Sequence, residues 1–542
     1  MDRGVTGTAD QTTEHADATN VDGQPTTFNR HGAIPPVALG YPDQQGASAS
    51  DLAFGNSALP LAAPGDLKAR ADRMEVERLL ESGGVTSGQD AIAALDFLLG
   101  MSDGERKKIV DRLDDRAFAN LLDRLTDDQR VRFTPIVEAA QDPKRRLKLW
   151  AAQHTSRARD DLDRYKGNFG DGDGTETDPQ ISAKERYNRR KSGVDSTEAE
   201  VTNETGALMK KRDLSVADVD KMRARKDKEL DVEIKHNINL VAETTPRADG
   251  SAVQWSEDET AQLDQSLDKL PAEQADGANA VAKYTRRANR NIMDTKGGQY
   301  NGNEIDIYDN AHIQPPGRDH VAPVEYAATH EIGHDVAHDN PAAFAKFEKA
   351  AGWHQTDRAA LEKQTTPENL EHVGGGVHVG DELVRRDDEG HYNAVDDTVI
   401  PSSKETGNDR WNYAAASGQE HFAEVYAMAV ETPELLYADY VEHPATRVRE
   451  LEALVHEQQS DPDKLADTKR QLEHARKAAA QRKQLYDIIR NDVFEMQKHQ
   501  REAVQRIKQR GANADQIKTF EQRSERVSTP AQLAGLEREL FP

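Results

Sequence analysis

The chain has 542 residues, of which 31% are charged and 36% hydrophobic, and its formal net charge is −26. This charge disfavours nucleic acids and anionic membranes as partners, and no apolar run is long enough to span a bilayer. The lack of cysteine excludes disulfides, thiol catalysis and cysteine-ligated zinc. The length and polarity predict a mainly α-helical multidomain protein with long solvated helices or disordered stretches.

Residues 1–65 are rich in Asp, Thr, Gln, Gly, Ala and Pro and show no hydrophobic periodicity, which predicts a disordered N-terminal arm. The sequence begins without the apolar core of a Sec-type signal peptide, so export would need another route. Two roles stay open for this arm, a loading or export signal and a solubilising tail.

Residues 66–150 contain a short repeat in which each unit opens with an acidic cap and closes with an apolar pair. This repeat predicts a small stack of short helices with a docking or interaction role. Residues 151–261 are very polar and predict exposed charged helices, which we interpret as a linker region. The apolar positions of the repeat match at a twelve-residue shift: Ile109 with Leu121, Val110 with Leu122, and Leu113 with Leu125.

The character of the chain changes near residue 262, where we expect an α+β domain that extends to residue 445. Residues 280–290 form a basic segment that predicts a helix. Between Glu304 and Asp309, polar and apolar residues alternate and place Ile305 and Ile307 on one face. This alternation, bounded by Gly and Asn, is typical of a strand.

The segment His330-Glu331-Ile332-Gly333-His334 is an HExxH motif. On a helix, residues four apart lie on one face, so two imidazoles at this spacing can bind one metal ion with the Glu beside it. Pro323 can open the helix and Pro341 can end it, with Asn340 as the cap of the next helix. The predicted core stripe, which does not include the histidines, is Val324, Ala328, Ile332 and Val336.

A zinc hydrolase needs a third protein ligand and an open position for water. His338 is two turns from His330 and cannot reach the same ion unless the helix breaks, so we expect it to be exposed or to support a ligand. A second helix is predicted to start at Ser417 or Gly418. There, Glu420 and Glu424 lie one turn apart, opposite the apolar face of Phe422, Val425, Tyr426 and Met428. An ordinary solvated helix face is the alternative interpretation of this pair.

The combination of H-E-I-G-H with a downstream Y-x(6)-E-H-F-A-E resembles the catalytic domains of anthrax lethal-factor-like toxin metallopeptidases, which are gluzincins. The resemblance covers residues 262–445 and implies a zincin-type domain with a small sheet beside the HExxH helix. The chain departs from the pattern at His421, where an aromatic residue is expected, and in the long insert before Glu420. The implied roles are Zn²⁺ ligation by His330, His334 and Glu420, general base catalysis by Glu331, oxyanion stabilisation by Tyr413, and orientation of a ligand histidine by Glu424.

The resemblance therefore implies a zinc-dependent endopeptidase, a toxin or effector that acts on proteins of a target cell. It would be made in the cytoplasm and exported by a dedicated secretion or injection system that binds the N-terminal region. The competing hypothesis is a helical interaction protein with a non-catalytic zinc site. In gluzincins an edge strand pairs with the extended substrate, and here that role falls on Glu304, Ile305, Asp306, Ile307 and Tyr308.

Two regions complete the chain. Residues 352–412 predict a loop-rich insert, and we expect its His372, His378 and His391 to be scattered and exposed rather than to line a cleft. Residues 446–542 are helical in pattern, with a turn at Ser460-Asp461-Pro462-Asp463. They predict a helical hairpin or bundle, for which structural and partner-binding roles are equally open.

Overall fold

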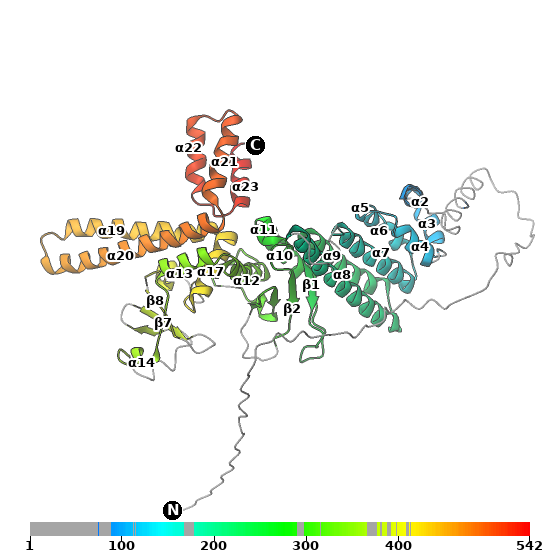
Figure 1. Cartoon of the computed structure of the whole chain (residues 1–542), viewed down its shortest axis with the longest axis horizontal. Helices are drawn as coiled ribbons and strands as arrows, with labels where there is room; N and C mark the ends of the chain where they lie inside the picture. Colours follow the sequence, from blue (N-terminus) through cyan, green and yellow to red (C-terminus); the bar gives the residue numbers. More distant parts are fainter. Residues whose placement is uncertain are drawn as a thin grey trace, which may run out of the picture. The chain divides into compact units, whose positions relative to one another are not determined.

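The computed structural model describes Met74 and residues 88–166 (except 112 and 114), 178–289, 297–365 (except 315), 377–379, 382–386, 392–396, 398–407, 411 and 414–542. The predicted arm of residues 1–65 lies outside these ranges. The described chain is mainly helical and has two small sheets (Figure 1), which confirms the coarse fold class. None of its helices combines the length and apolar character needed to cross a membrane.

The N-terminal helices are short and share one apolar core, as the repeat predicts. In this region Arg106 Nε donates to the Leu98 carbonyl at 3.0 Å, and Arg130 Nε donates to the Leu122 carbonyl at 2.8 Å. Both arginines lie in helices that start with a capping box. The repeating unit is therefore a pair of helices, not the single helix implied by the twelve-residue shift. The helices are α2 (Gly88–Gly100), α3 (Asp103–Val110), α4 (Asp115–Leu122), α5 (Asp127–Val131) and α6 (Thr134–Ala139).

The prediction of a solvated linker at residues 151–261 is wrong. Val201 and Val219 belong to the N-terminal core, and Val232 belongs to the main core. They lie in helices that follow α7 (Pro143–Arg164), with Val219 and Val232 in α9 (Val216–His236). Many charged residues of α7, α8 (Asp178–Lys210) and α9 are buried as ion pairs, such as Arg157 with Asp127 at 2.8 Å. Composition alone does not reveal this, because a paired charge can be buried whereas an unpaired one cannot.

The first sheet has the order β1-β2-β4-β3, in which β1, β2 and β4 are parallel and β3 is antiparallel. Its first strand precedes residue 262, so the predicted domain start is too late. The basic segment 280–290 contains strand β2 rather than a helix, because Tyr284 and Thr285 are buried and suit a pleated surface. The strands are β1 (Asn239–Ala242), β2 (Lys283–Arg286), β3 (Gly298–Tyr300) and β4 (Glu304–Ile307).

The predicted edge strand is an interior strand. Strand β4 pairs with β2 on one side and with β3 on the other, and the Tyr308 N–H donates to the Gly297 carbonyl. The reason is a hairpin in which Asn301 pairs with Glu304 and the two central residues are Gly302 and Asn303. Gly302 has a φ of +74°, which folds β3 back onto β4. The backbone groups of Glu304, Ile305, Asp306, Ile307 and Tyr308 therefore face neighbouring strands, and β3 is the edge.

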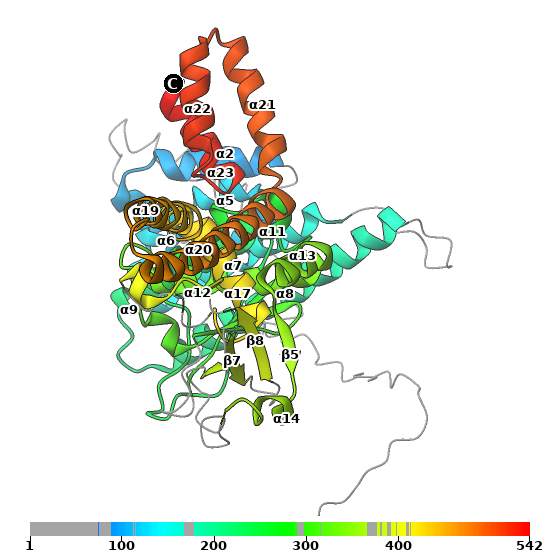
Figure 2. The ribbon, with the colours of Figure 1, turned by 90° about the vertical axis from the view of Figure 1, so that its left-hand side faces the viewer.

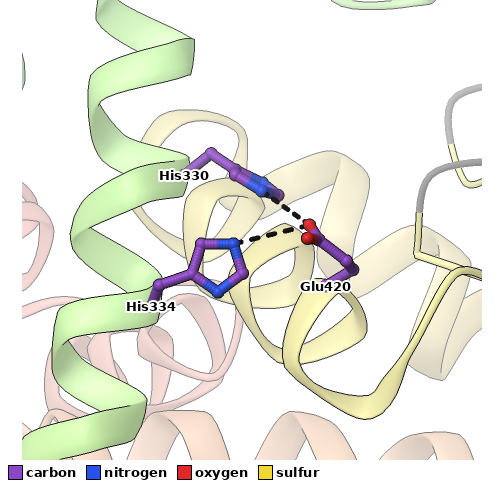
Figure 3. Close-up of side chains that lie close together, drawn as sticks. All are labelled: His330, His334 and Glu420. Atoms are coloured by element: carbon purple, nitrogen blue, oxygen red, sulfur yellow. Dashed lines mark hydrogen bonds and ion pairs between the residues drawn. The ribbon is translucent and has the colours of Figure 1, made fainter. Parts of the chain in front are cut away.

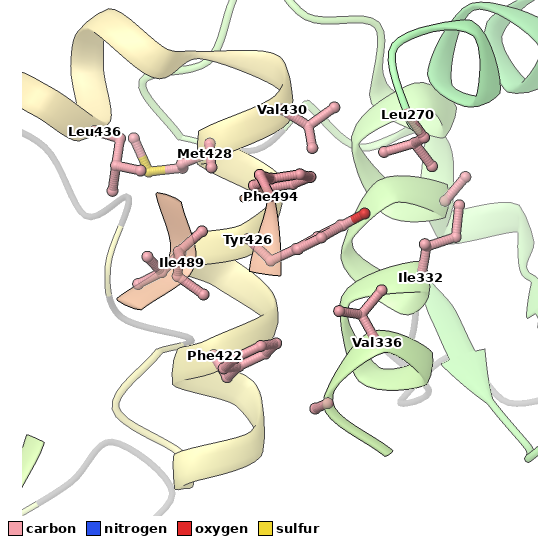
Figure 4. Packing of buried hydrophobic residues seen from close by; sticks show 14 of the residues in the cluster. Leu270, Ile332, Val336, Phe422, Tyr426, Met428, Val430, Leu436, Ile489 and Phe494 are labelled. Carbon is pink, nitrogen blue, oxygen red and sulfur yellow. The ribbon is translucent and has the colours of Figure 1, made fainter. Parts of the chain in front are cut away.

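Two crossing helices, α12 (Pro323–Asp339) and α17 (Gly418–Glu431), form the centre of the main core. The predicted stripe on α12 is buried, and Figure 4 shows Val336 on the side of α12 that faces Phe422 and Tyr426 of α17. The helices approach closely because Gly333 has no side chain, and a Cβ atom there would lie 2.9 Å from the Cα atom of Ala423. As predicted, Pro and Asn residues delimit α12 and α13 (Pro341–Ala351), and α10 (Glu257–Asp268) packs against α12.

The insert between α13 and α17 is not simply a loop. It contains an antiparallel sheet of order β5-β8-β7-β6, and its strands are too short for periodicity to reveal them. His378 lies in β6, whereas His372 and His391 lie outside the described residues. The elements are β5 (His354–Thr356), α14 (Arg358–Leu361), β6 (Val377–Val379), β7 (Glu382–Arg386), β8 (Tyr392–Asp396) and α16 (Ser403–Thr406).

Helices α19 (His443–Glu457) and α20 (Pro462–Ile488) form the predicted hairpin and lie side by side in Figures 1 and 2. The predicted domain boundary at residue 446 nevertheless does not separate two cores. The Gln532 side chain donates to the carbonyls of Ala429 and Val430, both at 2.9 Å, and Leu533 belongs to the main core. The other elements are α18 (Pro433–Tyr437), the π-helical η3 (Ala438–Glu442) and η4 (Ile489–Val493), α21 (Met496–Gln509), α22 (Ala514–Ser524) and α23 (Pro530–Leu540).

Candidate metal centre

The α12–α17 crossing brings the three predicted metal ligands together (Figure 3). Nε2 of His330 lies 3.0 Å from Oε2 of Glu420, and Nε2 of His334 lies 3.4 Å from the same oxygen. Ligand atoms from all three residues lie within 4.8 Å of one another. The three residues could therefore hold a metal ion.

Local structure fixes where each ligand stands. The two histidines are one turn apart on α12, and their ring centroids are 5.0 Å apart. Glu420 is in the first turn of α17, and its backbone N–H donates a hydrogen bond to the Ser417 hydroxyl at 3.2 Å. This N-cap sets the start of α17 and hence the position of the carboxylate.

The electrostatics of the ligands reflect their mutual contact. Burial alone would raise the pKa of Glu420, but the neighbouring His330 and His334 hold it well below its ordinary value. Burial likewise acts to lower the pKa of His330, yet Glu420 and Glu424 raise it well above the usual range. Two imidazoles and a carboxylate in a desolvated space favour a bound cation, and nitrogen with oxygen donors suits a divalent ion of borderline softness.

Glu424 lies one turn after Glu420 and is buried, so the pair is not a solvated helix face. Its Oε1 atom lies 3.3 Å from Nδ1 of His330, on the side of the ring away from Glu420. Its Oε2 atom accepts hydrogen bonds from Arg318 at 2.5 Å and from the Tyr326 hydroxyl at 2.7 Å. Burial would raise the pKa of Glu424, but Arg318 and His330 lower it to about 2.

Glu331 is buried beside the ligands but is not one of the converging donors. It faces β3, where a Cβ atom built on Gly298 would lie 2.5 Å from its Oε1 atom. Its carboxylate also accepts a hydrogen bond from the backbone of Tyr300. Burial raises the pKa of Glu331, although His330 and His334 partly oppose this shift.

His421, the departure from the family pattern, is completely buried and behaves as an aromatic residue with two polar contacts. Its ring is 5.0 Å from that of Phe347; Nδ1 accepts a hydrogen bond from Trp353 at 3.1 Å, and Nε2 lies 2.6 Å from the Tyr440 hydroxyl. Burial lowers the pKa of His421 to about 3, so the ring is neutral. The cluster anchors the first turn of α17, next to Glu420.

Other predicted residues stand outside the cluster. His338 is 72% exposed, as expected for a residue two turns from His330. Tyr413 lies outside the described residues, so its predicted role stays a prediction. Sequence reasoning missed Arg318 and Tyr326. Tyr326 had a usable signal, its position one turn before His330 on the same helix, whereas Arg318 comes from a loop and had none.

A second group of possible ligands consists of His236, Asp264 and Asp268. Here Lys235 contacts both aspartates, at 2.8 and 2.6 Å, and Lys228 contacts Asp264 at 3.0 Å. The aspartates already have cationic partners, so this group does not need a metal ion.

Comparison of the chain with protein-family models, with curated proteins and with solved structures gave no match. What the chain does must therefore be inferred from its own residues.

Proposed function

We propose that the chain is a zinc-dependent endopeptidase of the lethal-factor-like gluzincin type. The observation that supports this most is the convergence of His330, His334 and Glu420 beside a buried carboxylate, Glu331, that is not a donor. Two His and one Glu are a known catalytic zinc set that leaves a position for water. A purely structural site would gain nothing from a buried carboxylate held next to that position.

When bound, a zinc ion would lower the pKa of a water molecule and polarise a scissile carbonyl. Glu331 takes the proton from the attacking water and passes it to the leaving amine. Its pKa, raised by burial, brings it closer to the range that suits a general base near neutral pH. The backbone hydrogen bond from Tyr300 keeps the carboxylate aimed at the site.

Strand β3 is the surface on which we place the substrate. The Asn301 N–H donates to the Glu304 carbonyl and the Tyr308 N–H donates to the Gly297 carbonyl, so the backbone groups of Gly298 and Tyr300 face away from β4, where the Tyr300 N–H already donates to Glu331. An extended peptide can add to such an edge by main-chain hydrogen bonds. A peptide bound to β3 would lie beside Glu331. Strand β4, which was predicted for this role, cannot pair with a substrate because it is inside the sheet.

Two parts of the proposal rest on the sequence resemblance. Tyr413 would donate a hydrogen bond to the oxyanion that forms at the scissile carbonyl. The biological role would be that of a toxin or effector that a dedicated secretion or injection system delivers to a target cell, where it cleaves proteins.

The proposal is tested by measuring zinc content and cleavage of a generic unfolded protein for the wild type and for Glu331→Gln. We expect Glu331→Gln to keep one zinc per chain and to lose ~10²–10⁴ in rate, because a general base is removed without removing a ligand. Glu325→Gln is the matched control on the same helix, and it should keep its activity. Full activity in Glu331→Gln would exclude Glu331 as the general base. Zinc binding without proteolysis by the wild type would favour a non-catalytic zinc site.

A further inference from the structure

Arg318 is a buried cation in the loop before α12, with only 3% of the residue exposed. The loop is built to hold it there: Gly317 takes a left-handed conformation with a φ of +71°, and the Arg318 carbonyl accepts hydrogen bonds from Val321 and from the Gln314 side chain. Burying a guanidinium is costly unless a charged group compensates it. The charged group that compensates Arg318 therefore indicates the role of this residue.

That partner is Glu424, whose two oxygen atoms face different groups. Oε2 accepts hydrogen bonds from Arg318 and Tyr326, whereas Oε1 faces Nδ1 of His330 at 3.3 Å. The guanidinium also lies over the Tyr326 ring, 4.2 Å from its centroid, which fixes the two donors relative to each other. The result is a continuous buried chain from Arg318 and Tyr326 through Glu424 to a metal ligand.

We propose that Arg318 and Tyr326 are positioning residues of the metal centre, and that they act on His330 through Glu424. This inference rests on the proposed zinc site. With Oε2 held by two donors, Glu424 keeps Oε1 on Nδ1 of His330. A carboxylate at Nδ1 selects the tautomer that leaves Nε2 free for a metal and fixes the ring orientation.

A purely structural ion pair would join the same helices without affecting the ligands, and the chain contains one for comparison. Lys269 contacts Glu325 of α12 and Glu431 of α17, and neither carboxylate touches a histidine. Lys269 is therefore a matched control for Arg318. Both cations pair with carboxylates at the α12–α17 crossing, Lys269 with Glu325 and Glu431 and Arg318 with Glu424, but only the partner of Arg318 contacts a ligand.

The test measures zinc affinity by chelator competition on the full chain for Arg318→Met, Tyr326→Phe and Lys269→Met, each in the wild-type and the Glu424→Gln background. Loss of a group that supports a metal ligand typically weakens binding ~10–100-fold, which we expect for Arg318→Met, with a smaller loss for Tyr326→Phe. Lys269→Met should leave zinc affinity unchanged. In the Glu424→Gln background, Arg318→Met and Tyr326→Phe should add no further loss, because both act through that carboxylate.

Equal losses in both backgrounds, or none in either, would overturn the inference. If Arg318→Met does not fold, two other proteins still test the inference. One is Arg318→Met/Glu424→Gln, which has no unpaired buried charge, and the other is the single variant Tyr326→Phe. Failure of the proposed metal site looks different, because the wild-type chain would then bind no zinc at all. If the wild type binds zinc, and His334→Ala abolishes this binding while Arg318→Met and Tyr326→Phe do not weaken it, the metal site stands and only the positioning role is overturned.

Discussion

Two buried polar clusters connect α12 to α17, and they differ in how their charges are balanced. The ligand cluster is His330, His334, Glu420 and Glu424, and the lysine cluster is Ser266, Lys269, Glu325, Thr329 and Glu431. In the lysine cluster Thr329 Oγ1 donates to Glu431 at 2.6 Å, and Lys269 contacts both carboxylates. In the ligand cluster two Nε2 atoms and a carboxylate oxygen converge instead.

The difference separates a scaffold from a site. Lys269 balances one of the two carboxylates of the lysine cluster, and a proton on Glu431 can balance the other, so this cluster does not need a metal ion. Lone pairs that converge on one point need a proton or a cation between them, and imidazole with carboxylate favours a metal ion. Mutations in the two clusters should therefore have separable effects, on metal and activity in one and on stability in the other.

The largest expected effect is the loss of metal from the ligand cluster. His334→Ala should abolish stoichiometric zinc binding and proteolysis, because two ligands cannot hold a zinc ion in a catalytic site. His338→Ala, one turn further along α12 and 72% exposed, should keep both properties. Metal analysis after dialysis measures the difference, and unchanged zinc in His334→Ala would disprove the ligand assignment.

The next effect concerns the substrate side. Gly298→Ala should lower kcat/KM by ~10²-fold with zinc retained, because the methyl group would displace the Glu331 carboxylate and a small misplacement is costly in catalysis. Gly297→Ala is the control, since a Cβ atom there would make only ordinary contacts at 3.5 Å and beyond. Equal activity of the two variants would show that β3 does not constrain Glu331.

Local signals explain which parts of this site could be predicted. The apolar stripe, the caps and the i, i+4 histidines of α12 are all encoded within one helix, so His330, Glu331 and His334 could be placed from sequence. The Gly302-Asn303 turn is also a local signal, and it indicates that the segment before it pairs with β4.

Other features depend on long-range contacts and could not be predicted. Arg318 reaches Glu424 across more than a hundred residues, and no periodicity marks it. The burial of α7–α9 depends on ion pairs such as that between Arg190 and Asp161, at 2.5 Å, which composition cannot distinguish from solvated charges. Both the position of Arg318 and the burial of α7–α9 therefore depend on contacts between residues that are far apart in the sequence.

The lysine cluster should reveal itself through pH rather than through metal. Burial raises the pKa of Glu431 to about 7, although Lys269 opposes the shift. The folded state then binds a proton that the unfolded state releases near pH 4.5. Its stabilising contribution is therefore present below pH 4.5 and is lost as the pH rises through about 7.

Denaturant unfolding between pH 4.5 and 8 measures this effect. The free energy of unfolding should decline with rising pH, and Glu431→Gln should remove ~1–3 kcal/mol of that decline while zinc affinity stays unchanged. Burial also raises the pKa of Glu233 to about 7, so part of the decline should survive in the variant. An identical pH profile in Glu431→Gln would show that Glu431 is ionised throughout this range.

The smallest effect compares two helix caps, one at the start of the helix that carries Glu420 and one at the start of the helix that carries Ser266. Ser417 accepts the Glu420 N–H at 3.2 Å at the start of α17, and Ser256 accepts the Glu259 N–H at 3.1 Å at the start of α10. Loss of such a cap costs ~0.5–2 kcal/mol, so Ser417→Ala and Ser256→Ala should destabilise the protein similarly. Only Ser417→Ala should also weaken zinc binding, because its cap fixes a residue that is itself a ligand. If both variants keep wild-type zinc affinity, the rest of α17, including the His421 contacts with Trp353 and Tyr440, is sufficient to hold Glu420 in place.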